Sequence, residues 1–286
     1  MDWLIDPFSF DFMQRALAAG VLAVLTTSVV GTWVILRGLA FMGDALAHGV
    51  LPGIALALLL GVDPMLGAAV AALVMVGAIS LVHRTTRLTE DTGIGLLFVG
   101  MLALGVILIS RSGSFAVDLV AILFGDVLGT SWGDLAVQGA AAVIAVGGVI
   151  LLYRPLLVLS FNEQKAATLG LRPRLAHLVM MGLITLAVVA SFPTVGALLV
   201  FGLLVAPPAT AVLVARRVPT VMVAAAVLGT VEVAAGLLIS YHLDTAAGAT
   251  MSGLAVAVFF LVLAGVRVRA AWTGRRADAG AGDTLS

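Results

Sequence analysis

The chain has 286 residues, of which 62% are hydrophobic and 10% are charged, and it has no cysteine. This composition excludes an ordinary soluble domain and predicts several membrane-spanning helices, while the lack of cysteine excludes disulfides, thiolate metal ligands and cysteine nucleophiles. The formal net charge is +0, so the distribution of the charges is more informative than their sum, and we expect no nucleic-acid partner.

Apolar runs of the ~20 residues needed to cross a bilayer predict nine helices in chain order. They cover residues 15–36, 38–60, 65–82, 93–110, 134–153, 177–192, 195–215, 220–240 and 246–266. The sixth and seventh are nearly continuous and interrupted by Pro193, so they also fit one broken pair. The predicted fold class is therefore an all-α, polytopic transmembrane bundle of about eight to nine spans.

Two further segments do not fit a simple span. Residues 115–129 are apolar but carry Asp118 and Asp126, which favours a short interfacial or re-entrant segment. Residues 273–286 consist largely of Gly, Ala, Asp and Arg and are predicted to be a disordered tail. The chain thus divides into a transmembrane domain, residues 1–272, and a cytoplasmic tail, residues 273–286.

The lysines and arginines predict the orientation, because cytoplasmic loops carry an excess of these residues. If the loops at 37–43, 83–92, 154–176 and 216–219 and the C-terminus share one side, that side holds 13 of the 15 basic residues. Only Arg15 and Arg111 lie opposite. The N-terminus is therefore predicted to be outside and the C-terminus cytoplasmic.

Asp44 and His48 lie inside the second predicted span. Residues four apart share one face of a helix, so the two side chains lie one turn above the other. An ionised Asp near the bilayer centre costs roughly 2.5–3.5 kcal/mol on insertion scales, so such a residue is seldom kept without a use. A carboxylate oxygen beside an imidazole nitrogen suits Mn, Fe or Zn. The alternative is a structural hydrogen bond between helices.

Glu232, twelve residues into the eighth span, is the other deep acid. It is either a protonated structural carboxyl or a third metal residue facing the aqueous path, where a hard oxygen ligand would favour Mn or Fe over Zn. The remaining acids and one histidine belong to the predicted outer face, where acids at a mouth concentrate cations. They are Asp63, Asp118, Asp126, His242 and Asp244. His177 lies at a predicted cytoplasmic helix end and is interpreted as an interfacial anchor.

The longest cytoplasmic loop contains a predicted short amphipathic helix. Ser160 is placed to cap it, Glu163 lies three residues on, and Gly170 is placed to stop it. Phe161, Ala166 and Leu169 then form a compact apolar face. On composition alone, a membrane-surface helix and a docking element for a cytoplasmic partner are about equally supported.

Several stretches together resemble the permease subunit of ABC importers for divalent metals of the manganese, zinc and iron class, over nearly the whole chain. The most specific is RGLAFMGDALAH at residues 37–48, followed by LPG at 51–53. The others are FNEQKAATLGL at 161–171, VGALLV at 195–200, APPATA at 206–211, Ser240-Tyr241, Asp244 and Gly248-Ala249.

The resemblance implies a permease homodimer in the bacterial plasma membrane, in contact with lipid, driven by cytoplasmic ABC ATPase subunits. An extracytoplasmic metal-binding protein would deliver the cation. Asp44 and His48 then become metal-contacting residues of the translocation path, and the metal is a transported substrate, with no permanently bound cofactor. The helix at 161–171 becomes the coupling element, with Phe161, Glu163, Ala166, Leu169 and Gly170 as its docking residues.

Two other classes of protein compete with this interpretation. ATP hydrolysis needs a glycine-rich phosphate loop ending in Gly-Lys-Ser/Thr, and the single lysine, Lys165, is followed by Ala166. The chain is therefore not expected to be an enzyme. The alternative function is an ion- or proton-coupled secondary cation transporter using Asp44 and Glu232, which inverted repeats would favour; no clear repeat is present.

Overall fold

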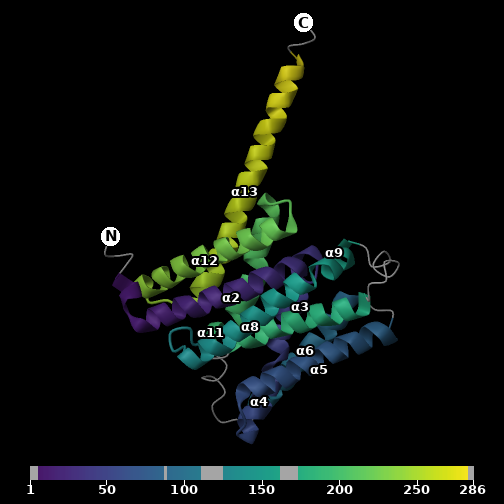
Figure 1. Ribbon diagram of the computed structural model, residues 1–286, viewed down its shortest axis with the longest axis vertical. Helices are drawn as coiled ribbons and strands as arrows, with labels where there is room; N and C mark the ends of the chain where they lie inside the picture. Colours follow the sequence, from purple (N-terminus) through teal and green to yellow (C-terminus); the bar gives the residue numbers. More distant parts are fainter. Residues whose placement is uncertain (1–5, 87–88, 111–124, 162–172, 283–286) are drawn as a thin grey trace.

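In the computed structural model, which describes residues 6–86, 89–110, 125–161 and 173–282, the chain is helical with no strand in these ranges (Figure 1). The elements are η1 (Asp6–Ser9), α2 (Asp11–Leu36), α3 (Ala40–Gly49), α4 (Leu51–Leu60), α5 (Pro64–Thr85), α6 (Glu90–Ile109), α8 (Trp132–Leu151), α9 (Tyr153–Phe161), α11 (Pro173–Val214), α12 (Val218–Leu243) and α13 (Ala247–Gly282).

Eight helical segments of the described chain are long and apolar enough to cross a membrane. They are Asp11–Leu36, Ala40–Leu60, Pro64–Val82, Asp91–Ile109, Trp132–Leu151, Leu175–Phe192, Val218–Leu243 and Ala247–Trp272, and Leu199–Val214 is a shorter apolar helix. The predicted all-helical class is confirmed, and the eight candidate spans are the lower end of the predicted eight to nine, because the seventh predicted helix corresponds to the shorter Leu199–Val214. The orientation of the termini stays a prediction.

Helix starts follow the capping residues of the sequence. Asp63 precedes Pro64 at the first position of α5 and accepts a hydrogen bond of 2.7 Å from the backbone N–H of Met65. Ser131 and Asp134 form a reciprocal capping box at the start of α8. These side chains satisfy N–H groups that the first helical turn leaves without partners.

The second span is divided, which the sequence analysis does not predict. α3 ends at Gly49, α4 begins at Leu51, and Pro52 lies in the first turn of α4. Proline has no N–H to donate to the carbonyl four residues earlier, which here is that of His48. The division of the span therefore falls directly beside the Asp44–His48 pair.

α11 contains the predicted interruption between the sixth and seventh helices, but at a different residue. The sequence predicts the break at Pro193, whereas the non-helical residue is Gly196, with φ 74° and ψ 164°. A positive φ is strained for residues with a Cβ and accessible to glycine. Gly196 therefore changes the chain direction, while Pro193 stays within helical backbone.

α2 and α11 form the centre of the bundle. α2 packs against α11, α12, α8 and α3, and α11 also packs against α13, α3, α8 and α5. Buried side chains of α2 include Met13, Trp33 and Val34, and those of α11 include Met181 and Leu199. Every other spanning helix except α4 and α6 therefore rests on one of these two helices or on both.

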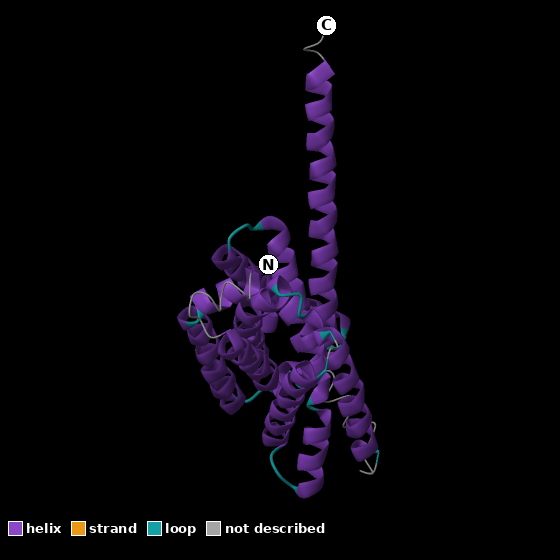
Figure 2. Ribbon diagram, turned by 90° about the vertical axis from the view of Figure 1, so that its right-hand side faces the viewer, coloured by secondary structure: helices purple, strands orange, loops and turns teal. Residues whose placement is uncertain are grey.

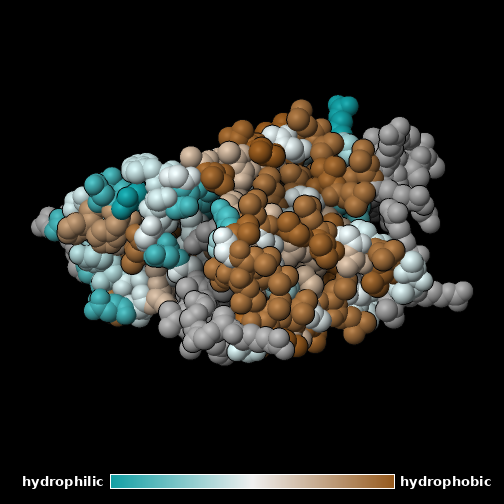
Figure 3. Space-filling model, turned by 90° about the horizontal axis from the view of Figure 1, so that it is seen from below, coloured by the Kyte–Doolittle hydropathy of each residue, from teal (hydrophilic) through white to brown (hydrophobic). Residues whose placement is uncertain are grey.

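The outer surface is apolar where lipid is expected. Seen from below, brown hydrophobic residues cover most of the side formed by α5 and α6, and hydrophilic residues gather at one end (Figure 3). Large exposed side chains there include Leu66, Val70 and Leu73 of α5 and Leu96 and Val99 of α6. A continuous apolar surface of this kind suits a bilayer and not water.

α13 leaves the bundle as a single long helix, as Figures 1 and 2 show from two directions. Between Ala247 and Trp272, its buried residues are Gly248, Met251, Ser252 and Ala255, all in the first three turns. The helix continues to Gly282, where the sequence analysis predicts a disordered tail from residue 273. Residues 273–282 contain three alanines and two arginines, which favour helical backbone, and three glycines, which disfavour it. The division into two domains stays a prediction.

α9 extends to the start of the predicted coupling segment, where a new helix was expected to begin. Ser160 lies inside α9, and its hydroxyl donates a 2.9 Å hydrogen bond to the carbonyl of Leu156. The prediction that Ser160 caps a helix beginning after it is therefore wrong, because helical backbone already begins at Tyr153, with Pro155 in its first turn. Glu163, Ala166, Leu169 and Gly170 lie outside the described residues, as does the side chain of Phe161.

Candidate functional site: the Asp44–His48 pair

Asp44 and His48 lie one turn apart on α3, as their spacing predicts. His48 Nε2 is 3.4 Å from Asp44 Oδ1, and the two side chains are 22% and 26% exposed. Both therefore remain reachable from outside the protein, although they belong to a helix whose other residues from Met42 to Val50 are buried. The span that contains them, Ala40–Leu60, is apolar enough to cross a membrane.

The histidine ring is held by an aromatic side chain of another helix. Phe98 of α6 meets the His48 ring edge to face, with ring centroids 5.9 Å apart, and meets the ring of Phe41 at 5.7 Å in the same way. Such contacts orient a ring without using its nitrogens. The Phe98 contact therefore fixes the ring plane of His48 from one side without engaging a ring nitrogen, while Nε2 faces Asp44.

The backbone beside Asp44 is packed against α11. A Cβ on Gly43 would collide with the side chain of Leu204 and approach Phe201. The lack of a side chain at Gly43 therefore lets α3 lie close to the second half of α11 without displacing the end of the Leu204 side chain. Asp44, the next residue, is positioned by this packing.

The pair offers one oxygen and one nitrogen ligand, which suits borderline divalent cations. In the part of the chain that the structure describes, no group of three or more His, Asp, Glu or Cys side chains lies close enough to share a metal ion. Two protein ligands leave most of a coordination sphere to other donors. This arrangement permits binding and release and does not form a closed structural site.

Glu232 is not brought to this pair. It is 2% exposed, and neither carboxylate oxygen has a hydrogen-bond partner. Gly229, one turn before it, lies against Val24 of α2 and Pro207 of α11, and Gly236, one turn after it, lies against Met251 of α13. α12 packs on α2, α11 and α13, whereas α3 packs mainly on α6 and α11 and to a smaller extent on α5 and α2. The central helices separate the two sites.

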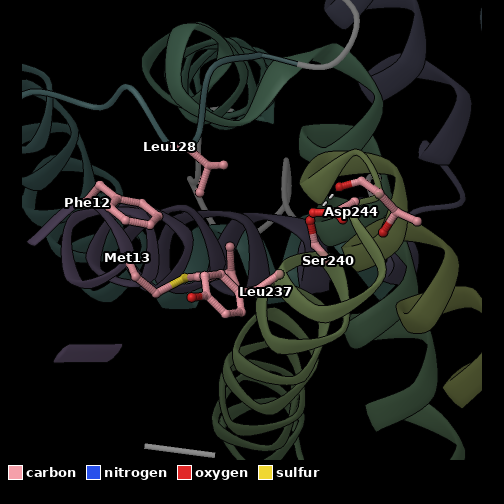
Figure 4. A pocket seen from close by; sticks show the side chains of 8 residues that line it. Phe12, Met13, Leu128, Leu237, Ser240 and Asp244 are labelled. Carbon is pink, nitrogen blue, oxygen red and sulfur yellow. Dashed lines mark hydrogen bonds between the residues drawn. The ribbon is translucent and has the colours of Figure 1, made fainter. Parts of the chain in front are cut away.

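A cavity of about 600 Å³ lies at the end of the bundle where α2 begins and α12 ends (Figure 4). Its lining combines apolar side chains with side chains that carry a hydroxyl or a carboxyl group; the apolar ones are Phe12, Met13, Leu128 and Leu237, and the others are Ser240, Tyr241, Asp244 and Thr245. The hydroxyl of Ser240 donates a 2.6 Å hydrogen bond to the carbonyl of Thr245, which fixes the turn after α12. Of the predicted outer acids, Asp244 lines this cavity, whereas Asp63 caps α5.

Two features of the site have little or no signal in the sequence. Phe98 reaches His48 from a helix about fifty residues further along the chain, which no local pattern reveals. Arg37 reaches α11, where its Nη1 lies 3.1 Å from His177 Nδ1. His177, interpreted from the sequence as an interfacial anchor, therefore has a specific partner.

Comparison with known proteins gives a consistent result along the whole chain. The family model described as the ABC 3 transport family matches residues 9–266. The chain is 38% identical over 274 residues to the manganese transport system membrane protein MntC of Halalkalibacterium halodurans, covering 94% of each chain. It is 34% identical over 257 residues to the chelated iron transport system membrane protein YfeD of Yersinia pestis, covering 90% of this chain and 86% of the other.

A solved structure has the same fold. PsaBC from Streptococcus pneumoniae in complex with Fab contains a chain that superposes with a TM-score of 0.81 at 33% sequence identity. The similarity covers 91% of this chain and 94% of that chain. The arrangement of helices around α2 and α11 is thus shared with a protein of known structure.

Proposed function

The chain belongs to the ABC 3 transport family and is the membrane permease of an importer of the manganese and iron class; from this premise we propose that Asp44 and His48 bind the cation during translocation. A permease of this class is a multi-pass membrane protein that does not hydrolyse ATP. The observation that carries the proposal is the partly exposed carboxylate–imidazole pair, 3.4 Å apart, inside a segment long and apolar enough to span a membrane.

The cation is a divalent ion of intermediate softness, Mn²⁺ or Fe²⁺. Asp44 supplies a hard oxygen, His48 supplies an imidazole nitrogen, and no cysteine is present to favour a softer ion. Two protein ligands bind such an ion weakly, which suits a site that must release it again. Water or the same pair in a second copy of the chain supplies the remaining ligands.

The permease works with three kinds of partner in this proposal. A second copy forms a homodimer, cytoplasmic ABC ATPase subunits dock on residues 161–171, and an extracytoplasmic protein delivers the metal. The distribution of Lys and Arg supports a cytoplasmic location of residues 154–176 and an outer location of the cavity beside Asp244. Zinc remains a third candidate substrate on ligand chemistry alone.

The dependence on a separate ATPase is tested with the purified chain in liposomes. The chain alone should take up no Mn²⁺ when ATP is supplied, whereas the chain reconstituted with its ATPase subunit should accumulate Mn²⁺ only with hydrolysable ATP. Glu163→Arg in the docking segment should abolish uptake by the complex, and Arg217→Met, at an exposed position before α12, serves as the control. ATP-driven uptake by the chain alone would refute the proposal.

A further inference from the structure

The turn between α2 and α3 is fixed by its backbone. The N–H of Gly38 donates to the carbonyl of Ile35 at 3.1 Å, and the N–H of Leu39 donates to the carbonyl of Val34 at 2.9 Å. This pair of bonds, with Gly38 at φ 68°, is a Schellman motif. Arg37 is the C-cap residue of α2 within this motif, so the start of its side chain has a defined position three residues before α3 begins at Ala40.

The Arg37 side chain contacts the first turns of α11. Its Nη1 lies 3.1 Å from Nδ1 of His177 and 3.7 Å from Sδ of Met180. His177 and Met180 are three residues apart and share one face of the helix. Because arginine only donates, Nδ1 of His177 is the acceptor in this hydrogen bond.

α11 therefore contacts the metal-bearing helix α3 and its leading turn at two separate places. Near the beginning of α11, His177 and Met180 hold Arg37. Beyond the break at Gly196, Leu204 and Phe201 pack on Gly43, the residue before Asp44. α3 is thus supported at its leading turn and in its middle by two halves of one helical element.

The beginning of α11 follows the docking segment directly. α11 starts at Pro173, and the residues proposed to bind the ATPase are 161–171. His177 lies four residues after Pro173, about one turn of 3.6 residues into α11, so an axial displacement of the start of α11 would carry His177 with it. Arg37 then connects that displacement to α3, which carries Asp44 and His48.

We propose that the contact of Arg37 with His177 is a positioning contact that transmits movement of the ATPase-docking segment to the Asp44–His48 helix. Neither side chain binds the cation; each acts through α3. The inference rests on the proposed function, because it takes residues 161–171 as the docking segment and Asp44 and His48 as metal ligands. Loss of the contact between Arg37 and His177 should uncouple ATP hydrolysis from transport without separating the subunits.

The test measures Mn²⁺ transported per ATP hydrolysed by the permease reconstituted with its ATPase subunit. Arg37→Met and His177→Leu should each lower this ratio about tenfold, as expected for a lost hydrogen bond to a charged group. ATP hydrolysis should persist. His177→Gln keeps an acceptor of similar size and should restore most of the ratio. Arg217→Met, which removes an exposed arginine on the same predicted side, should leave it unchanged.

A double variant separates the contact from independent damage to the fold. If the contact itself transmits the movement, Arg37→Met with His177→Leu should be no worse than either single variant. The inference would be overturned if the losses in the two single variants multiply in the double variant. It would also be overturned if the transport ratio of Arg37→Met equals that of the wild type, or if His177→Gln and His177→Leu have equal ratios. If the complex with Arg37→Met does not assemble, the difference in transport ratio between His177→Leu and His177→Gln tests the inference. Absence of Mn²⁺ uptake by the wild-type complex would instead refute the proposed function.

Discussion

Asp44 on α3 and Glu232 on α12 are both acids inside membrane-spanning segments, but their surroundings differ in every respect that matters for transport. Asp44 is 26% exposed and has His48 as a partner at 3.4 Å. Glu232 is 2% exposed, and both of its oxygens lack partners. A transported ion must reach its ligand and leave it again, which Asp44 permits and Glu232 does not.

The comparison shows why depth in a span is a poor guide to function by itself. An intramembrane acid is expensive at either position if it is ionised. At Asp44 that cost is offset by a neighbouring imidazole and by access to solvent or a cation. At Glu232 nothing offsets the cost of a charge, so the neutral carboxylic acid is the form compatible with its surroundings.

The largest effect is expected from removal of the ligands on α3. Loss of an outer-shell partner alone typically costs ~10–100-fold in metal affinity, so loss of a ligand itself should lower uptake at limiting Mn²⁺ by about a hundredfold or more. Asp44→Asn and His48→Ala should each show this loss in reconstituted complexes. Asp91→Asn, an exposed acid in the first turn of α6, is the matched control. Normal uptake in both ligand variants would restore the structural interpretation of the pair.

A smaller effect is expected from the aromatic support of His48. Phe98→Leu keeps an apolar side chain but removes the edge-to-face contact, and such aromatic pairs contribute about 0.5–1.5 kcal/mol. Uptake at limiting Mn²⁺ should therefore fall by roughly three- to tenfold. Phe260→Leu, at a 60% exposed position on α13, should have no effect. An unchanged rate in Phe98→Leu would mean that the ring orientation of His48 does not limit transport.

The smallest effect on transport is expected at Glu232. Glu232→Gln preserves shape and removes the ionisable group, so uptake and the preference between Mn²⁺, Fe²⁺ and Zn²⁺ should match those of the wild type. Glu232→Met should keep or raise thermal stability, because replacing a buried polar group that has no partner with an apolar one of similar volume is neutral or stabilising. Altered metal preference in Glu232→Gln would show that Glu232 reaches the path and would remove the distinction from Asp44.

Much of this arrangement could be predicted from the sequence, because membrane spans depend on length and hydropathy and the Asp44–His48 pair depends on helical spacing alone. The position of the break in α11 could not be predicted reliably. Pro193 is the stronger local signal, but tertiary packing places the non-helical residue at Gly196, where the N–H and Cα of Gly196 lie beside Gly125.

Contacts between residues far apart in the sequence could not be predicted from local patterns either, because they depend on tertiary packing. Phe98 meets His48, and Arg37 meets His177 140 residues further along the chain, because α6 and α11 pack on α3 and α2. The separation of Glu232 from Asp44 likewise depends on how α2 and α11 lie between their helices. The division of the second span at Val50 did have a local signal, because Pro52 lies in the first turn of α4 and has no N–H to donate to a preceding carbonyl.

The most direct test of the central claim is pulsed EPR of Mn²⁺ bound to the reconstituted permease–ATPase complex without the delivery protein. The chain has only four histidines, so a nitrogen coupling to the ion can be assigned by substitution. We predict a ¹⁴N coupling of directly bound imidazole in the wild type that persists in His242→Gln and disappears in His48→Ala. A coupling that survives in His48→Ala, or bound Mn²⁺ with no imidazole coupling in the wild type, would contradict the account.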